Sequence, residues 1–247
     1  MPTSDPATEP GGTLLLCGAT GGLGAALLRE AVAAPRFDRV AAAARRPELI
    51  PGPASVLRLP FDLEDEPSLA GLAVAAPPPL RTVLCATGLL HDAAMRPEKT
   101  LRALDPEQML RSYRINAVGP ALLAKHLLPR FPRDRAGVFA VFGARVGSIA
   151  DNRSGGWYSY RAAKAALAML VRCLAIEVAR THPHLVCVGL HPGTVATPLS
   201  APFRAGLAAD RVFAPAEAAV RLWDVIDRLV PADSGGVLDW KGELVPA

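Results

Sequence analysis

Tyr160 and Lys164 are the two side chains whose types and spacing indicate chemistry most clearly. They are four residues apart, so on a helix they lie on one face, about one turn from each other. A tyrosine has a pKa of about 10, but a neighbouring ammonium stabilises its phenolate and lowers that pKa toward the working range. General acid catalysis is strongest when the pKa lies near the operating pH. Such a pair can protonate a carbonyl oxygen as a hydride arrives from a nicotinamide, although the same spacing also occurs by chance on solvated helices.

A glycine-rich turn near the start of the chain gives this pair a context. Residues 14–17 are an apolar strand, residues 18–24 read Gly-Ala-Thr-Gly-Gly-Leu-Gly, and a helix with an Ala/Leu face begins at about residue 25. Small residues let the backbone of such a turn approach a pyrophosphate, and the helix N-terminus supplies unpaired N–H groups and the positive end of the dipole. We therefore expect a dinucleotide here, rather than a glycine-rich loop without a ligand. The expected contacts are Gly18, Thr20, Gly22, Leu23 and Gly24.

Two arginines follow the second predicted strand, Arg39–Ala44. At this point dinucleotide sites recognise the adenosine ribose, since an acidic side chain accepts from the 2′-OH and an arginine accommodates a 2′-phosphate. Asp38 precedes the strand and so belongs to the opposite edge of the sheet. Arg45 and Arg46 therefore favour NADP(H) over NAD(H) as the cofactor, the alternative being that both are ordinary solvated side chains.

Asp62 and Leu63 follow the third predicted strand, residues 54–59. Ligands of open α/β sheets bind outside the carboxyl ends of the strands. Asp62 is therefore placed to hydrogen-bond the adenine amino group, with Leu63 against the ring. It is equally suited to capping the helix predicted over residues 64–75, and the two roles are compatible.

The fourth predicted strand, residues 82–86, ends in Thr87 and Gly88, which are small enough for the backbone to run beneath a cofactor. The loop that follows is too long for a minimal connection, and loops of this kind often line active sites. A helix is then expected over residues 105–131. Asn116 lies in the middle of it, where asparagine has poor helix propensity, so it either has a buried hydrogen-bonding task or is an ordinary satisfied core residue.

The alternation of strands and helices predicts an α/β fold with a doubly wound, Rossmann-type parallel sheet of about seven strands and helices on both faces. The remaining strands are expected at residues 138–142, 185–190 and 237–240, and the remaining helices at residues 158–181 and 215–230. A chain of 247 residues can bury one large core, so residues 13–247 are predicted to form a single domain.

Composition excludes several classes of function. Residues 1–12 are rich in Pro, Thr and Glu without an apolar run, so we expect a flexible tail and not a signal peptide. No stretch approaches the ~18 apolar residues of a membrane span. The net charge of +4 is dispersed over short arginine-containing stretches, which argues against nucleic-acid binding. We expect a cytoplasmic protein. Four single cysteines in apolar segments are predicted to be reduced core residues and not metal ligands: Cys17, Cys85, Cys173 and Cys187.

Taken together and in this order, these motifs resemble the short-chain dehydrogenase/reductase family, in particular its C-factor and sniffer-like carbonyl reductases, over nearly the whole chain. The resemblance implies that Tyr160 is the catalytic acid/base, that Lys164 holds the nicotinamide ribose and lowers the tyrosine pKa, and that Asn116 anchors a water for proton relay. It also implies that the segment after the sixth strand embraces the nicotinamide carboxamide. The cofactor-binding residues there are Pro192, Gly193, Val195 and Thr197, with Tyr160 and Lys164 also touching the cofactor.

One departure from the family pattern concerns catalysis. Members place a serine shortly after the fifth strand to hydrogen-bond the substrate carbonyl, and here that position is Ala144. Ser148 is the nearby hydroxyl that can substitute, so it is counted with the catalytic residues. An orienting hydrogen bond of this type is worth about 10²-fold or more in rate. Either Ser148 replaces the family serine, or the enzyme is slow, or activity is lost.

Two functions from different classes remain. The first is an NADP-dependent oxidoreductase that interconverts an aldehyde, ketone or quinone with an alcohol. The second is a catalytically impaired NADP-binding or signalling protein on the same fold. The substrate pocket is expected to be walled by residues 89–96, 145–157 and 199–212. The family resemblance and the apolar helices 101–131 and 158–181 suggest a homodimer or homotetramer.

Overall fold

The structure is a computed structural model that describes residues 11–247, with the exception of the side chain of Ala209. Of the tail expected over residues 1–12, residues 1–10 therefore lie outside the described part of the chain. At the start of the described chain, the Gly12 N–H donates to Asp38 Oδ2 at 2.8 Å. That bond ties the start of the described chain to the residue that precedes the second strand.

Seven parallel strands form one sheet in the order β3-β2-β1-β4-β5-β6-β9. Their bounds are β1 Thr13–Cys17, β2 Arg39–Ala44, β3 Leu57–Pro60, β4 Leu80–Cys85, β5 Gly137–Phe142, β6 Leu185–His191 and β9 Val237–Asp239. The chain adds strands outward from β1 to β3 on one side, and then crosses over to add β4, β5, β6 and β9 on the other side of β1. The sheet is therefore doubly wound. The predicted fold class is confirmed.

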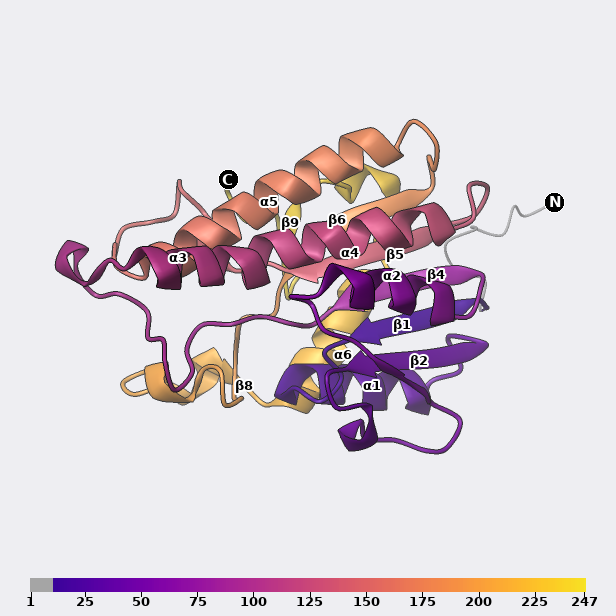
Figure 1. The fold of residues 1–247 in the computed structure, drawn as a ribbon, viewed down its shortest axis with the longest axis horizontal. Coiled ribbons are helices and arrows are strands. Elements are labelled where there is room, and N and C mark those ends of the chain that lie inside the picture. Colours follow the sequence, from indigo (N-terminus) through magenta and orange to yellow (C-terminus); the bar gives the residue numbers. More distant parts are fainter. Residues whose placement is uncertain (1–10) are drawn as a thin grey trace.

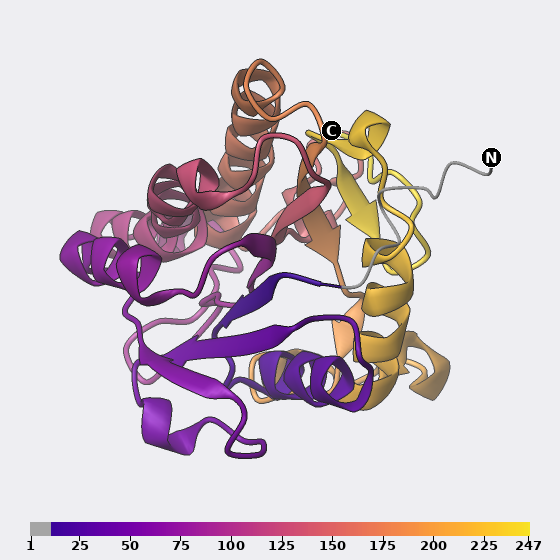
Figure 2. The ribbon, with the colours of Figure 1, turned by 90° about the vertical axis from the view of Figure 1, so that its right-hand side faces the viewer.

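Helices cover both faces of this sheet, as Figure 2 shows. The helices are α1 Gly22–Ala33, α2 Glu66–Ala75, α3 Pro106–Tyr113, α4 Gly119–Leu127, α5 Tyr158–Val178 and α6 Pro215–Ile226. One buried cluster joins the sheet to α2, α4 and α5, and the other joins it to α1 and α6. Because both faces are covered, the central strands are apolar along their whole length: Leu15 belongs to the first cluster, and Leu14 and Leu16 to the second.

Most predicted elements are confirmed with boundary shifts of one to three residues, but the helix expected over residues 105–131 is divided. α3 runs into a π-helical turn at Arg114–Val118, and α4 continues from Gly119. Asn116 lies in the π-helical turn. Such turns are rare and are often found at functional sites.

Two further corrections concern small features. Cys173 is exposed on α5, whereas the other three cysteines are buried, so its assignment to the core was wrong. The structure also contains two short strands that the sequence does not predict, β7 Thr194–Val195 and β8 Val212–Phe213, which pair in a separate sheet. Strands of two residues carry no periodic signal. Their pairing brings together the two ends of the segment 196–211, which follows β6 at the carboxyl edge of the main sheet.

Figure 1 shows where a ligand of this sheet would bind. The strands point toward the left of the view, and the long connections after β4 and around β8 extend beyond their carboxyl ends on that side. Within residues 11–247, no helix is both long and apolar enough to span a membrane.

Candidate active site

The glycine-rich turn between β1 and α1 packs tightly against the end of β4. Gly18 has a φ of +86°, and a Cβ there would lie 3.0 Å from the Ala86 carbonyl. A Cβ on Gly24 would lie 2.2 Å from the Gly18 carbonyl oxygen. Gly18 therefore needs its left-handed backbone, and Gly24 must lack a side chain for α1 to begin so close to the turn. The expectation that this turn needs small residues agrees with the geometry at both glycines.

The N-terminus of α1 is open toward the carboxyl edge of the sheet. Its N-cap residue, Gly21, provides no side-chain hydrogen bond to the first turn. A Cβ on Gly22 would lie 2.8 Å from Thr197 Cγ2, so the segment after β6 lies directly against this turn. The structure thus brings the predicted phosphate site and the predicted carboxamide site together at one helix N-terminus, where donors and dipole favour an anion.

Arg45 and Arg46 lie where β2 ends, and both are exposed. The N–H groups of Gly18 and Ala19 donate to the Ala43 carbonyl oxygen, at 2.8 and 3.3 Å, so the arginines follow a strand that is joined to the glycine-rich turn. Asp38 lies at the amino end of the same strand, as predicted. Two cationic side chains therefore follow β2 at the carboxyl edge of the sheet, and the acidic Asp38 lies at the other end of that strand.

Asp62 follows β3, and its Oδ1 accepts from the Glu64 N–H at 3.0 Å. The proposal that it caps the next helix is wrong, because Asp65 is the N-cap of α2 and accepts from the Ser68 N–H. Leu63 is buried, and a Cβ on Gly119 would lie 2.5 Å from its Cγ. Asp62 is thus free of helix capping and lies in the turn at the carboxyl edge.

Tyr160 and Lys164 occupy the first two turns of α5 and face the same side. The Lys164 Nζ lies 5.6 Å from the centroid of the Tyr160 ring and donates to the Phe142 carbonyl oxygen at 2.6 Å. A Cβ on Gly88 would lie 3.9 Å from that Nζ. The ammonium group is therefore fixed between the end of β5, the loop after β4 and the tyrosine ring.

Burial shifts the pKa values of both groups in opposite directions. It raises the pKa of Tyr160 to about 12 and lowers the pKa of Lys164 to about 8, because a low-dielectric surrounding penalises each charged form. The lowered tyrosine pKa expected from the spacing is thus not what this structure has. Tyr160 is thus a protonated phenol at neutral pH and a weak acid in the absence of a ligand, and Lys164 titrates at about pH 8.

Asn116 joins the π-helical turn to the loop after β4. Its Oδ1 accepts from the Leu89 N–H at 3.0 Å, and its Nδ2 donates to the Leu89 carbonyl oxygen at 2.7 Å. The Nδ2 also donates to the Ser112 carbonyl oxygen at 3.1 Å. A Cβ on Gly88 would lie 3.4 Å from the Asn116 Oδ1. Asn116 is thus buried and satisfied by the backbone of the loop beside Lys164, which fits both a functional hydrogen-bonding task and an ordinary core asparagine.

Comparison with known proteins identifies the class. A family model for short chain dehydrogenases matches residues 13–208. The chain belongs to the short-chain dehydrogenase/reductase family. C-signal from Myxococcus xanthus is 37% identical over 145 residues, which are 58% of this chain and 81% of C-signal. The predicted resemblance to that group is confirmed, and this family consists of oxidoreductases that act on small molecules.

Two solved structures share the fold over almost the full length. The NADPH-bound carbonyl reductase from chicken fatty liver has a TM-score of 0.82 at 22% identity and covers 100% of both chains. The carbonyl reductase Sniffer of D. melanogaster has a TM-score of 0.82 at 20% identity and covers 97% of this chain and 100% of its own. At these identities the likeness establishes the architecture.

Within this short-chain dehydrogenase, Ala144 and Ser148 lie in the turn after β5. Ser148 is buried, and its Oγ accepts from the Asp151 N–H at 3.0 Å. Both residues line a cavity of about 630 Å³ between this turn, α5 and the C-terminal segment, which Lys164 also lines. Tyr160 does not line that cavity. The structure therefore brings Ser148 close to Lys164 and gives no contact between Ser148 and Tyr160 among the described residues.

An aromatic chain connects the three predicted pocket walls beside Tyr160. The ring centroids of His91 and Phe203 lie 5.4 Å apart, those of Phe203 and Trp157 4.9 Å, and those of Trp157 and Tyr160 6.3 Å. All three contacts are edge-to-face, which aromatic rings prefer. His91 Nε2 also lies 3.1 Å from the carbonyl oxygen of Leu199. The walls thus meet at one point, next to the proposed acid.

The contact between Glu98 and Ser159 could not be predicted from the sequence. Glu98, in the loop after β4, is 3% exposed and hydrogen-bonds both the N–H and the hydroxyl of Ser159 at the start of α5. A single glutamate in an irregular loop forms no pattern, and its partner is 61 residues away. Only the three-dimensional fold brings the two together.

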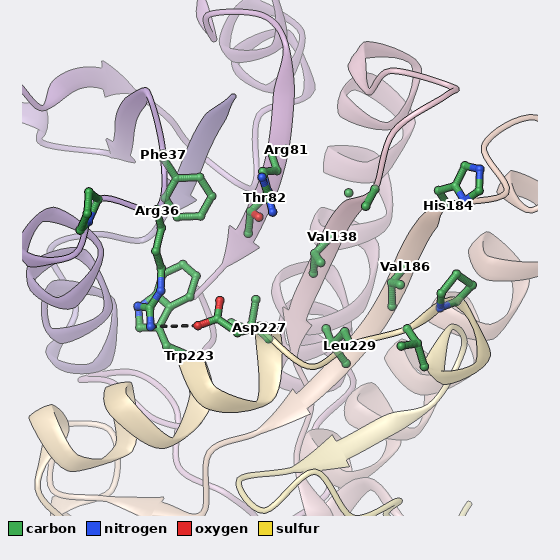
Figure 3. Close-up of a pocket in the computed structure, with 16 residues that line it drawn as sticks. Arg36, Phe37, Arg81, Thr82, Val138, His184, Val186, Trp223, Asp227 and Leu229 are labelled. Atoms are coloured by element: carbon green, nitrogen blue, oxygen red, sulfur yellow. Dashed lines mark ion pairs between the residues drawn. The ribbon is translucent and has the colours of Figure 1, made fainter. Parts of the chain in front are cut away.

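A second cavity lies at the opposite, amino-terminal edge of the sheet (Figure 3). It measures about 460 Å³ and lies where β4, β5 and β6 begin, at Thr82, Val138 and Val186. Arg36 pairs with Asp227 at 2.9 Å and lies over the Trp223 ring at 5.2 Å from the centroid. None of the predicted site residues lines this cavity, so it is separate from the active site.

Proposed function

We propose that this short-chain dehydrogenase is an NADP-dependent oxidoreductase that interconverts an aldehyde, ketone or quinone with an alcohol. The observation that carries the proposal is the position of Lys164 Nζ, between the Tyr160 ring and the Phe142 carbonyl oxygen and beside Gly88. This arrangement lies at the sheet edge to which the glycine-rich turn also belongs.

The residues present fit a dinucleotide. The uncapped first turn of α1 offers N–H groups and the positive end of the dipole to a pyrophosphate, and the small residues Thr87 and Gly88 let the backbone run close to a ribose. The proposed contacts to the cofactor remain those expected from the sequence. They are Gly18, Thr20, Gly22, Leu23, Gly24, Arg45, Arg46, Asp62, Leu63, Thr87, Gly88, Tyr160, Lys164, Pro192, Gly193, Val195 and Thr197.

Arg45 and Arg46 support NADP(H) over NAD(H). Both are exposed, and neither side chain has an ion pair or hydrogen bond with another described residue. Guanidinium groups bind phosphate through paired, charge-assisted hydrogen bonds. The chicken carbonyl reductase of the same fold binds NADPH, which adds support.

The mechanism assigns one task to each side chain. When bound, the nicotinamide supplies the hydride for the carbonyl carbon. Tyr160 then donates its hydroxyl proton to the carbonyl oxygen, and its raised pKa keeps the phenol protonated in the ground state. Lys164 stabilises the phenolate that remains. Asn116 fixes the loop at Leu89 and is the proposed anchor of a proton-relay water.

Ser148 is the proposed donor to the substrate carbonyl. Its oxygen accepts a hydrogen bond from the Asp151 N–H, and its own O–H has no acceptor among the described residues. That hydrogen is therefore free to be donated. Since Tyr160 does not line the cavity of Ser148, the proposal requires the turn after β5 to bring the Ser148 hydroxyl to the oxygen that Tyr160 protonates. In this proposal the Ser148 hydroxyl takes the role of the family serine, in whose position this chain has Ala144.

The test is turnover of the purified protein with a panel of aldehydes, ketones and quinones, followed as loss of reduced nicotinamide with NADPH and with NADH. The proposal expects consumption that requires a carbonyl substrate and prefers NADPH. Tight NADPH binding without turnover on any substrate would contradict it.

A second function is favoured by one observation, the alanine at position 144. A non-catalytic NADP-binding or signalling protein would tolerate the loss of this hydroxyl, because it has no substrate carbonyl to orient. The relative from Myxococcus xanthus is named C-signal. NADPH binding without turnover is the outcome that this second function predicts.

We also propose that the protein is a cytoplasmic homodimer or homotetramer. Large apolar side chains are exposed on α3 and α5, among them Leu110, Tyr113, Met169 and Ile176. Such side chains gathered on two neighbouring helices favour burial against a second copy. Analytical ultracentrifugation tests this, and a monomer at all concentrations would contradict it.

A further inference from the structure

The helix that carries Tyr160 begins without a cap of its own. Its N-cap residue, Trp157, has a left-handed backbone with φ of +51° and ψ of +40° and makes no side-chain cap hydrogen bond. No acidic residue lies in the first turn of α5. The first N–H groups of a helix have no intrahelical acceptor and must find partners elsewhere. The start of this helix therefore depends on another segment.

Glu98 supplies those partners from the loop after β4. Its carboxylate accepts from the Ser159 N–H at 3.2 Å and from the Ser159 hydroxyl, and its backbone carbonyl accepts from the Trp157 N–H. A Cβ on Gly156 would lie 3.4 Å from the same carbonyl oxygen. Side chain and backbone of Glu98 thus both hold the start of α5, one residue before Tyr160.

Glu98 is a buried carboxylate whose hydrogen-bond partners lie at the start of α5. The side chain is 3% exposed, and no described lysine, arginine or histidine forms an ion pair with it. A buried carboxylate without a cation is unfavourable unless hydrogen bonds satisfy it. Here the N–H and hydroxyl of Ser159 and the positive end of the α5 dipole provide that compensation.

The loop that bears Glu98 is also fixed at two other points. Asn116 holds it at Leu89 through two hydrogen bonds, and His91 Nε2 lies within hydrogen-bond distance of the carbonyl oxygens of Pro198 and Leu199. The same loop therefore contacts the helix of Asn116, the segment after β7 and the start of α5. The expected wall of the substrate pocket and the turn that contains Tyr160 are therefore joined through one loop.

We propose that Glu98 is a positioning residue, which caps α5 from the loop after β4 and thereby fixes the placement of the Tyr160 hydroxyl. The proposal rests on the function proposed above. It assigns Glu98 no contact with substrate or cofactor. Its effect is on the geometry of proton transfer, for which a displacement of about 1 Å can reduce the rate about 10²-fold.

The test compares Glu98→Ala, Glu98→Gln and Ser159→Ala with a matched control, Glu177→Ala, an exposed glutamate on the same helix. Glu98→Gln keeps an oxygen that accepts from the Ser159 N–H and an amide that donates to the Ser159 hydroxyl. The proposal expects kcat to fall about 10²-fold in Glu98→Ala and to recover to within about tenfold of wild type in Glu98→Gln. The Kd for NADPH should be unchanged in both.

Two outcomes would overturn the proposal. One is a Glu98→Gln variant whose kcat falls as far as that of Glu98→Ala, and the other is a Glu98→Ala variant that keeps the kcat of the Glu177→Ala control. If Glu98→Ala fails to fold, Ser159→Ala and Glu98→Gln carry the comparison, with a smaller loss expected in each.

Hydrogen exchange separates this proposal from the proposed function. The Ser159 and Tyr160 amides should exchange at least about tenfold faster in Ser159→Ala and Glu98→Ala than in Glu177→Ala, whether or not the protein turns over. Absence of wild-type turnover would refute the proposed function and with it the coupling to catalysis. Unchanged exchange would refute the capping itself.

Discussion

Lys164 Nζ donates a hydrogen bond of 2.6 Å to the carbonyl oxygen of Phe142, the last residue of β5. This bond fixes the ammonium group at the carboxyl edge of the sheet, and the Tyr160 ring lies on the other side of it. The strand thereby determines the direction of a side chain that belongs to a helix. Both elements are needed for the lysine to act on the tyrosine.

The pH dependence of carbonyl reduction should follow Lys164. Burial lowers its pKa to about 8, so the ammonium is present below that pH and is lost as the pH rises through it. The kcat/KM for reduction is expected to be constant at lower pH and to decline above about 8. Lys164→Arg, whose guanidinium stays charged, should show lower activity without that decline. A decline that persists in Lys164→Arg would show that another group titrates.

Arg45 and Arg46 should determine the choice of cofactor. Replacement of both by alanine removes charge-assisted hydrogen bonds to a 2′-phosphate, which are worth about 1.5–3 kcal/mol each. The KM for NADPH is expected to rise at least about tenfold, and the KM for NADH to remain nearly constant. The control is Arg29→Ala, an exposed arginine on α1. Equal changes for both cofactors would rule out a contact to the 2′-phosphate.

Ser148→Ala tests the replacement of the family serine. Loss of a donor to the substrate carbonyl should lower kcat/KM about 10²-fold, and addition of Ala144→Ser to that variant should restore part of the loss. Steady-state kinetics and a thermal melt are measured together. If only the melting temperature falls, Ser148 does no more than hold the turn through the Asp151 N–H.

The turn between β1 and α1 should tolerate no side chain at Gly24. A Cβ there lies 2.2 Å from the Gly18 carbonyl oxygen, so Gly24→Ala should lower the free energy of unfolding by about 1–3 kcal/mol. Gly71→Ala is the matched control, because no atom lies within 4 Å of its Cβ and alanine favours the helix by about 1 kcal/mol. Urea denaturation measures both. A neutral Gly24→Ala would mean that the turn can relax.

The sequence predicts the sheet well because its strands are buried on both faces and appear as apolar runs. The resemblance to the short-chain dehydrogenase family groups Asn116 with Tyr160 and Lys164. In the structure a Cβ on Gly88 would lie 3.4 Å from the Asn116 Oδ1 and 3.9 Å from the Lys164 Nζ. The π-helical turn at Arg114–Val118 could not be predicted, since a single widened turn does not alter the apolar pattern around it.

Other features depend on contacts between distant segments. The raised pKa of Tyr160 results from burial by the surrounding fold, whereas the sequence shows only the neighbouring lysine. Asp65 and not Asp62 caps α2 because the chain makes one further turn after β3 before the helix begins. The Glu98 cap on α5 joins residues 61 positions apart, and no local pattern signals it.

The most direct test of the account is hydride transfer from NADPH in Tyr160→Phe, beside the wild-type protein and with the best carbonyl substrate of the panel. Removal of the hydroxyl removes the proton donor and leaves the ring against Trp157 and Lys164. We predict that kcat/KM falls by about 10²–10⁴-fold, with the Kd for NADPH and the melting temperature unchanged. A Tyr160→Phe variant that reduces the substrate at the wild-type rate would contradict the assignment of Tyr160 as the acid.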